Sequence, residues 1–323
     1  MRPFLFLVQQ KLLLTTDSFL LYCAWAKERN PLPKTKLFVP AILIFTLLIV
    51  FSHSFSASQK NKVPQTPPTL IKRTASFHET RRMGFGGTVT VLGAPKGSVK
   101  VEGWSRNEVE FNADIEWQAE TEADLDLLAP LNNFAFDDDG DHLSILTTGT
   151  HDRDFMKRSA KNFPKRLLNL PWKADYRLRV PTSTDVEIDA GHGPVSLSGV
   201  EGALRVNATE SETTLTLTGG TVSVTIAAGN VNLSVPVRSW RGSGAEIRIA
   251  AGVLNVDFPG GFNGDIDADV LRVGKIVNGY DALETREKPG ITEHTIRARA
   301  GSGGAYFRFT IGDGMINIKK SGS

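Results

Sequence analysis

Residues 186–206 read VEIDAGHGPVSLSGVEGALRV, and they set the pattern for the second half of the chain. Within this stretch, apolar and polar residues alternate in three short runs that start at Val186, Val195 and Leu204, nine residues apart. Alternation with a period of two predicts strands that bury one face. Glycines separate the runs, and glycine readily adopts the backbone conformations of tight turns. The stretch therefore predicts a series of short strands joined by glycine turns.

The same alternation continues toward the C-terminus. Runs that begin at positions 222 and 231 keep multiples of nine from position 204, and later spacings drift between 7 and 16 residues. Such strands fit a stacked coil, in which each rung buries its apolar stripe against its neighbours. An antiparallel β-sandwich uses similar strands about 8–12 residues apart and is the alternative. The near-regular spacing favours an all-β, β-solenoid or β-helix-like stack.

Alternating runs also precede this repeat, from about Phe77 onward. They predict strands at 88–91, 99–104, 109–117, 134–136 and 143–146, with a short helix over 123–131 and a hairpin turn at 137–141. At the other end, 306–310 and 315–319 predict a last pair of strands across a turn at 312–314. We therefore expect one β-strand-repeat domain over residues 76–320.

Residues 147–173 interrupt the pattern with seven basic residues and three aromatic ones. One interpretation is a binding loop for an anionic glycan, a lipid headgroup or a protein partner, with Arg153, Lys157 and Arg158 as binding residues. The other is a solvated, partly helical insertion that packs its aromatic side chains on the sheet. We favour the second, because charged insertions are usually ordinary surface.

The N-terminal part of the chain has a different composition. Residues 37–51 carry no charge and follow Lys34 and Lys36, so 37–55 is expected to be a transmembrane helix or the apolar core of a cleaved signal. Residues 1–36 would then be a cytoplasmic or signal n-region segment, and the proline-containing residues 56–75 an unpacked linker. Both alternatives place the body outside the cytoplasm, because the positive flank stays inside.

The charge distribution and the cysteine count exclude several classes of function. The 323 residues include 37 Lys and Arg and 35 Asp and Glu, but residues 1–75 hold ten of the bases and only two of the acids. The rest of the chain therefore has a net charge of −6. No nucleic-acid partner is expected of such a body, because phosphate binding needs a basic surface. The only cysteine, Cys23, leaves no disulfide framework and no cysteine-based zinc site.

One acidic pattern is a candidate for chemistry. Asp265, Asp267 and Asp269 alternate in GDIDADV, so a strand would project all three from one face. Clustered acids can bind Ca²⁺ or cleave polysaccharides, but alternation alone also predicts an ordinary solvated strand face, which we favour. The chain has no HExxH motif, G-x-S-x-G elbow or P-loop. We therefore predict no catalytic residues, no metal site and no cofactor, and keep these aspartates as candidate binding residues.

Three stretches resemble a known family: GSVKVEGW at 97–104 followed by Glu108 and Val109, YRLRVP at 176–181 leading to VEI and GHG, and GMINI at 314–318. The resemblance, over roughly residues 77–320, is to bacterial proteins of unknown function with β-strand repeats that are labelled adhesins. It implies an exported β-solenoid-like domain, often tethered by a single helix. It brings no catalytic residues.

The leading expectation is a non-enzymatic, membrane-tethered scaffold or adhesin-like binding surface in the bacterial cell envelope. Its expected partners are an envelope polysaccharide or an envelope protein, with the membrane contacted through 37–55. The alternative is a carbohydrate-active β-helix enzyme that uses Asp265, Asp267 and Asp269. A third hypothesis is an envelope sensor that signals through the N-terminal segment.

Overall fold

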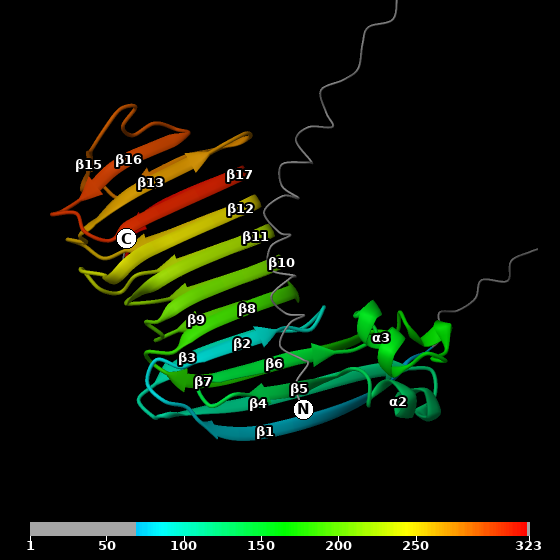
Figure 1. Ribbon diagram of the computed structural model, residues 1–323. Helices are drawn as coiled ribbons and strands as arrows, with labels where there is room; N and C mark the ends of the chain where they lie inside the picture. Colours follow the sequence, from blue (N-terminus) through cyan, green and yellow to red (C-terminus); the bar gives the residue numbers. More distant parts are fainter. Residues whose placement is uncertain (1–68, 322–323) are drawn as a thin grey trace, which may run out of the picture. The chain divides into compact units, whose positions relative to one another are not determined.

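The computed structural model describes residues 69–321 (Figure 1). Strands account for 63% of these residues and helices for 7%, so the all-β prediction is confirmed. Seventeen strands join in one hydrogen-bonded sheet. The predicted segments 1–36 and 37–55, and most of the predicted linker, lie outside the described residues. None of the helices between residues 69 and 321 is long and apolar enough to cross a membrane.

The first half of the body contains the helices. Its elements are β1 (Ile71–Arg82), β2 (Thr88–Leu92), β3 (Val99–Trp104), β4 (Glu108–Ala119), α2 (Glu122–Leu128), β5 (Asn133–Asp138), β6 (His142–Thr148), α3 (Arg153–Ser159), the 3-10 helix η1 (Lys165–Leu167) and β7 (Trp172–Pro181). The second half contains only strands: β8 (Asp185–His192), β9 (Val195–Ser198), β10 (Ala203–Thr216), β11 (Gly219–Ser234), β12 (Arg241–Phe258), β13 (Gly264–Val270), β14 (Gly274–Gly279), β15 (Leu283–Thr285), β16 (Thr295–Ala300) and β17 (Tyr306–Lys320).

The centre of the sheet is a parallel stack of β8, β10, β11, β12 and β17. Leu204 pairs with Val186 on one side and with Val222 on the other, so β8, β10 and β11 follow one another at an offset of eighteen residues. In this part of the stack the nine-residue spacing of the sequence therefore separates the two arms of one rung, and twice that spacing leads from one rung to the next. The offset grows to 23 residues from Val222 to Ala245 of β12, and to 62 residues from Ala245 to Phe307 of β17. This parallel pairing differs from the antiparallel sandwich that was the alternative.

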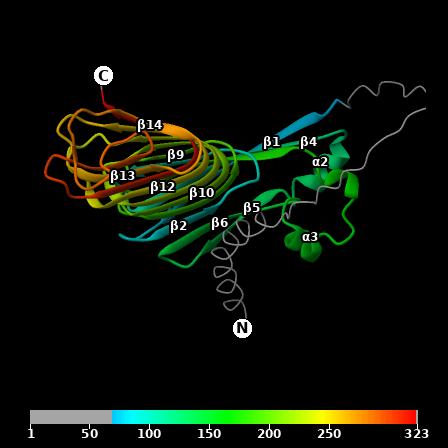
Figure 2. The ribbon, with the colours of Figure 1, turned by 90° about the horizontal axis from the view of Figure 1, so that it is seen from above.

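The long strands correct one prediction. The apolar runs at 204–206 and 215–217, expected as separate short strands, belong to the single strand β10, and β11, β12 and β17 each unite two runs in the same way. The expected turn at 312–314 is likewise only a bend within β17, both halves of which pair with β12. Each arm keeps the same register with the neighbouring strand on both sides of the bend, because that strand bends at the same place (Figure 2).

Glycines make these bends possible. Gly229, Gly252 and Gly314 lie side by side in adjacent rungs, and their φ angles are 133°, 151° and 140°, which L side chains rarely adopt. A Cβ atom on Gly252 would lie 1.7 Å from the carbonyl oxygen of Gly229, and one on Gly314 would lie 1.7 Å from that of Gly252. The backbones therefore stack at hydrogen-bonding distance only because no side chain stands between them.

The core follows from the same register. Apolar residues of successive rungs form rows that face the interior, and the members of one such row are at most 3% exposed. That row runs through Val186, Leu204, Val222, Ala245 and Phe307. Burial of large apolar side chains stabilises by about 1.5–3 kcal/mol each, so each rung adds to the core through its neighbours.

Antiparallel strands complete the sheet at both ends. β1, β4 and β7 pair antiparallel at one end, and β13 pairs antiparallel with β16 at the other. The predicted short helix is confirmed as α2, with Thr121 as its N-cap, and the predicted hairpin turn joins β5 to β6. β1 begins at Ile71, inside the predicted linker 56–75, because β4 supplies a ladder for residues that looked unpartnered.

We expect Gly252→Ala to lower the free energy of unfolding by several kcal/mol or to prevent folding, because the added methyl group would overlap the carbonyl of Gly229. Gly86→Ala is the matched control. Gly86 also has a positive φ, of 78°, but a Cβ atom there would have nothing within 4 Å. We therefore expect Gly86→Ala to lower the free energy of unfolding by only about 1–2 kcal/mol. Chemical denaturation of both variants measures the difference, and equal losses would contradict the role of backbone stacking.

Candidate functional site

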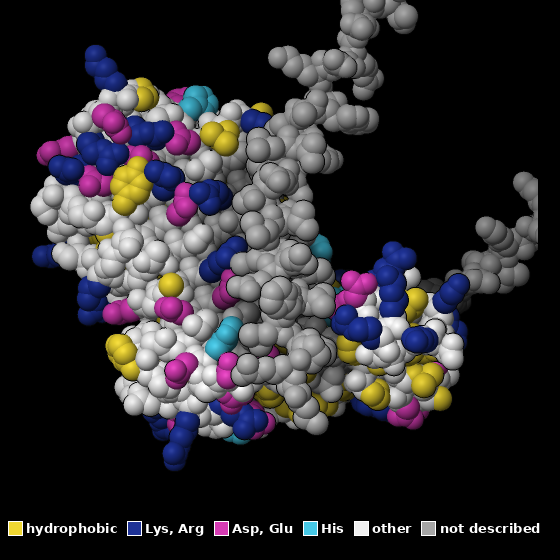
Figure 3. All heavy atoms as spheres, in the orientation of Figure 1, with side chains coloured by type: hydrophobic (Ala, Val, Ile, Leu, Met, Phe, Trp, Pro, Cys, Tyr) yellow, Lys and Arg dark blue, Asp and Glu magenta, His cyan; other side chains and the backbone are white. Residues whose placement is uncertain are grey.

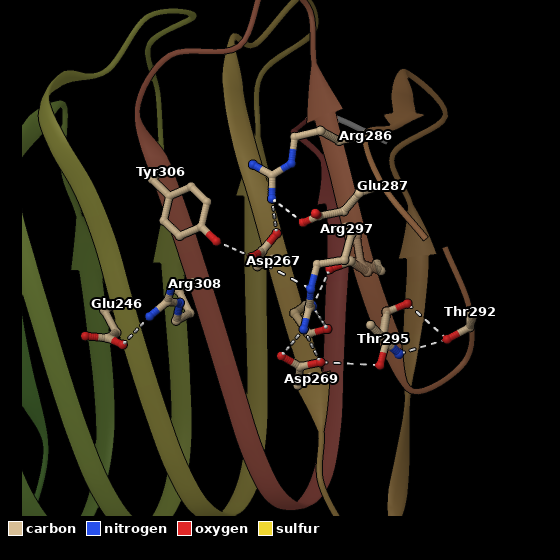
Figure 4. A network of polar contacts seen from close by, with 12 residues as sticks. Glu246, Asp267, Asp269, Arg286, Glu287, Thr292, Thr295, Arg297, Tyr306 and Arg308 are labelled. Carbon is tan, nitrogen blue, oxygen red and sulfur yellow. Dashed lines mark hydrogen bonds and ion pairs between the residues drawn. The ribbon is translucent and has the colours of Figure 1, made fainter. Parts of the chain in front are cut away.

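The three aspartates of β13 project from one face, as predicted, and β16 faces them with arginines (Figure 4). In the antiparallel register, Asp265 pairs with Arg299 and Asp267 pairs with Arg297. The alternation of acids in DIDAD is thus matched by the alternation of bases in TIRARA. We call these residues, with Arg286 and Tyr306, the Asp–Arg network.

Each aspartate is held by at least one guanidinium group. Arg299 Nε donates to Asp265 over 2.8 Å, and Arg286 Nη2 donates to Asp267 over 2.8 Å. Arg297 Nη2 donates to both carboxylate oxygens of Asp269, at 2.9 Å each. Further contacts link the pairs, because Arg286 also lies 3.8 Å from Asp265. The result is one connected set of ion pairs.

Tyr306, at the start of β17, joins the network to the adjacent rungs. Its hydroxyl donates to Asp267, and the guanidinium carbons of Arg286 and Arg308 lie 5.6 and 5.3 Å from the centre of its ring. Arg308 also lies 3.7 Å from Glu246 on β12. Cation–π contacts and ion pairs therefore hold the aromatic ring in place from two sides.

This arrangement limits the chemistry of the aspartates. Asp267 is only 7% exposed, so the expectation of an ordinary solvated strand face is wrong for it. Its carboxylate oxygens accept hydrogen bonds from Arg286 and Tyr306. Among residues 69–321, no three His, Cys, Asp or Glu side chains come together as a metal site would require. Because the carboxylates are occupied by internal partners, the network builds a rigid surface rather than a free acid–base pair.

A shallow hollow of about 320 Å³ lies beside Tyr306. It exists because Gly244 stands between Thr221 and Tyr306 in the register and carries no side chain. The polar groups around it are hydroxyls, a carboxylate, a guanidinium and a phenol, from Thr221, Ser223, Ser243, Glu246, Arg308 and Tyr306. No local sequence pattern points to these residues, because they come from three separate strands. In the sequence, the one indication of partners for the aspartates was the alternation of Arg297 and Arg299 with alanines.

The other predicted binding residues, Arg153, Lys157 and Arg158, lie on α3, at the opposite end of the stack from β13 (Figure 1). The structure does not bring the two sets of candidates together. The side chains of these three basic residues are exposed. In contrast, Trp172 is buried and Phe163 packs against the core. The structure of the insertion thus agrees with the favoured interpretation, since it is partly helical and packs Trp172 and Phe163 against the core. A binding role for either set stays a prediction.

Comparison with known proteins gives only distant likenesses. No family model matches the chain, and no curated protein matches it. Among solved structures, a "putative cell adhesion protein" from Clostridium sporogenes is 12% identical over 77% of this chain and 100% of its own, with a TM-score of 0.43. A "putative lipid binding protein" from Parabacteroides distasonis (10% identity, 77% and 95% coverage, TM-score 0.23) and a "putative adhesin" from Parabacteroides merdae (8%, 76% and 95%, TM-score 0.22) follow. With TM-scores below 0.5, none of the three carries an argument about function.

We expect Asp267→Asn to lower the free energy of unfolding by about 2–3 kcal/mol, because it leaves the half-buried guanidinium groups of Arg286 and Arg297 poorly compensated. Glu187→Gln is the control. Glu187 pairs with Arg205 at 3.3 Å on the same outer face, but its side chain is 40% exposed, so a change within about 0.5 kcal/mol is expected. Denaturant unfolding compares them, and a negligible loss in Asp267→Asn would show that the network does not stabilise the sheet.

A pH effect follows from the contact between η1 and α2. Arg166 donates two hydrogen bonds to Asp124, at 2.6 and 2.8 Å, and these hold the pKa of Asp124 below its ordinary value of 3.8 although burial raises it. A carboxyl with a lowered folded-state pKa contributes stability above about pH 4 and loses it as the pH falls through the folded pKa. We expect Arg166→Gln to lower the melting temperature at pH 7. At pH 3 the melting temperatures of the variant and the parent should differ less. Lys165→Gln, next to it, should show no such pH dependence.

Proposed function

We propose that residues 69–321 form a parallel β-solenoid that serves as an adhesin-like, non-enzymatic binding surface in a bacterial cell envelope. The eighteen-residue offset from β8 to β10 and from β10 to β11, and the in-register bends of the later strands, support the solenoid. The uncharged run at 37–51 behind Lys34 and Lys36 supports export and a membrane tether.

The hollow beside Tyr306 is the observation that carries the binding role. It offers hydroxyls that donate and accept, one carboxylate and one guanidinium, all beside an aromatic ring. Sugars expose hydroxyl groups alternating with apolar C–H faces, and polar groups placed next to an aromatic surface recognise that combination. We therefore propose that the hollow binds a saccharide unit of an envelope polysaccharide.

The Asp–Arg network would make this binding efficient. Tyr306 and Arg308 have contacts to Asp267 and Glu246 before any ligand arrives, so less conformational freedom is lost on binding. The same contacts disfavour the enzyme alternative, because a glycosidase needs one carboxyl group to give up a proton to the leaving group and another free to attack or to activate water. In the network those oxygens face arginines and a tyrosine.

Co-sedimentation of the full chain, purified in mild detergent, with isolated envelope polysaccharide tests the proposal. We expect Arg308→Gln to weaken binding about tenfold, since a charged hydrogen bond at the hollow is lost. Arg205→Gln is the matched control: Arg205 is 55% exposed against 52% for Arg308, and each pairs with a glutamate on the same face, but Arg205 lies outside the hollow.

The outcomes are distinct. Equal binding by both variants would reject the hollow as the site, and absence of sedimentation would reject polysaccharide as the partner. Sugar released into the supernatant by the parent chain, and lost in Asp267→Asn, would favour the enzyme instead.

A further inference from the structure

We propose that the basic lobe, residues 153–166 of α3, η1 and their connection, docks on the anionic lipid surface of the membrane that tethers the chain. The inference rests on the proposed tether. It assigns a partner to a charged region at the opposite end of the stack from the saccharide hollow.

The charge of the lobe is largely uncompensated. Residues 153–166 contain six basic residues and one acid, Asp154. Lys157 lies 3.3 Å from Asp154, and Arg166 is bound by Asp124. Arg158 interacts electrostatically with Asp152, the N-cap of α3. The other three bases are exposed and form no ion pair within residues 69–321, in contrast to the arginines of the Asp–Arg network; they are Arg153, Lys161 and Lys165. Lysine and arginine side chains gather over α3 in the space-filling view (Figure 3).

The acids of the neighbouring helix each have a basic partner, although two of them share one. On α2, Glu122 and Asp126 both accept hydrogen bonds from Arg73 of β1, at 2.5 and 2.8 Å. Asp124 accepts from Arg166. None of these acids forms an ion pair with Arg153, Lys161 or Lys165, and these three cations are left for an external anion.

The position of the lobe in the chain indicates that this external anion is the lipid surface of a membrane. β1 enters the sheet at this end, because Ile71 pairs with Ala119, three residues before α2 begins. Only fifteen residues, 56–70, separate Ile71 from the predicted membrane segment, and they reach at most about 50 Å. The lobe is thus joined to the membrane segment by a short stretch of chain, which keeps its effective concentration at the lipid surface high.

The physical mechanism is attraction of exposed bases to lipid phosphates. It is effective only within about a Debye length, roughly 8–10 Å at physiological salt, so the short tether and the three unpaired cations act together. Each cation that reaches the surface contributes about fivefold to the docking equilibrium. Docking at this end would leave the opposite end, with the hollow, directed away from the bilayer.

Fluorescence energy transfer in proteoliposomes tests the docking. A dye on Ser159→Cys, in a Cys23→Ser background, is the donor, and labelled lipid is the acceptor. With the full chain we expect stronger transfer in vesicles that contain phosphatidylglycerol than in phosphatidylcholine vesicles, and loss of the difference at high salt. Arg153→Gln, Lys161→Gln and Lys165→Gln together should abolish the difference.

The control carries the same change in net charge elsewhere. Lys275→Gln, Lys288→Gln and Lys319→Gln remove three exposed cations from the opposite half of the body and should leave the transfer unchanged. Equal transfer in both kinds of vesicle, or an equal loss in both triple variants, would overturn the docking. Loss of transfer on adding a soluble anionic polysaccharide to neutral vesicles would assign the lobe to a glycan instead.

Flotation with the same vesicles separates this proposal from the tether. Flotation with neutral vesicles reports the tether alone, and its failure would reject that part of the proposed function. In that case flotation with anionic vesicles only, lost in the lobe variant and retained in the control, would still support the lobe. Absence of flotation with either kind of vesicle would reject both.

Discussion

The close stacking of backbone at the glycine bends is the constraint on which the rest of the structure depends. Gly97, Gly193, Gly229, Gly252, Gly314 and Gly274 all have positive φ angles, and a Cβ atom on any of them would lie 1.7–2.0 Å from the carbonyl oxygen of an adjacent rung. Ser211 takes the corresponding place in β10, where its hydroxyl is buried against that of Thr213 at 3.1 Å. Because every rung turns at the same level, its two arms stay in register with the rungs on either side.

In-register stacking then determines both faces of the sheet. On the inner face it aligns apolar side chains into continuous rows. On the outer face it sets residues of one rung opposite those of the next, and oppositely charged residues meet in the same row: Glu187 with Arg205, Glu246 with Arg308, and Asp267 with Arg297. Opposite charges across a strand pair stabilise and like charges destabilise, so the alternation suits a parallel stack. The Asp–Arg network extends this rule to an antiparallel end.

The two charged regions differ in how they are compensated, and this difference separates their proposed roles. In the Asp–Arg network the acids and bases satisfy one another and hold Tyr306 beside an open hollow, which is the property of a rigid recognition surface. In the basic lobe Arg166, Lys157 and Arg158 have acidic neighbours, and three further cations form no ion pair within residues 69–321, which is the property of a region that meets an external anion.

The sequence alone determined the all-β class, the nine-residue period, the position of α2 and the shared face of Asp265, Asp267 and Asp269, because alternation and turn residues are local properties of the chain. It did not show that two periods make one rung, since the bend inside β10, β11, β12 and β17 is recognisable only when glycines of different rungs lie side by side. Only the tertiary structure brought Arg286 and Tyr306 to the aspartates and Glu246 to Arg308, and left Arg153 without an ion pair among residues 69–321. Those contacts join residues that are far apart in the chain, and side-chain pairing between strands depends on register, which a single sequence does not contain.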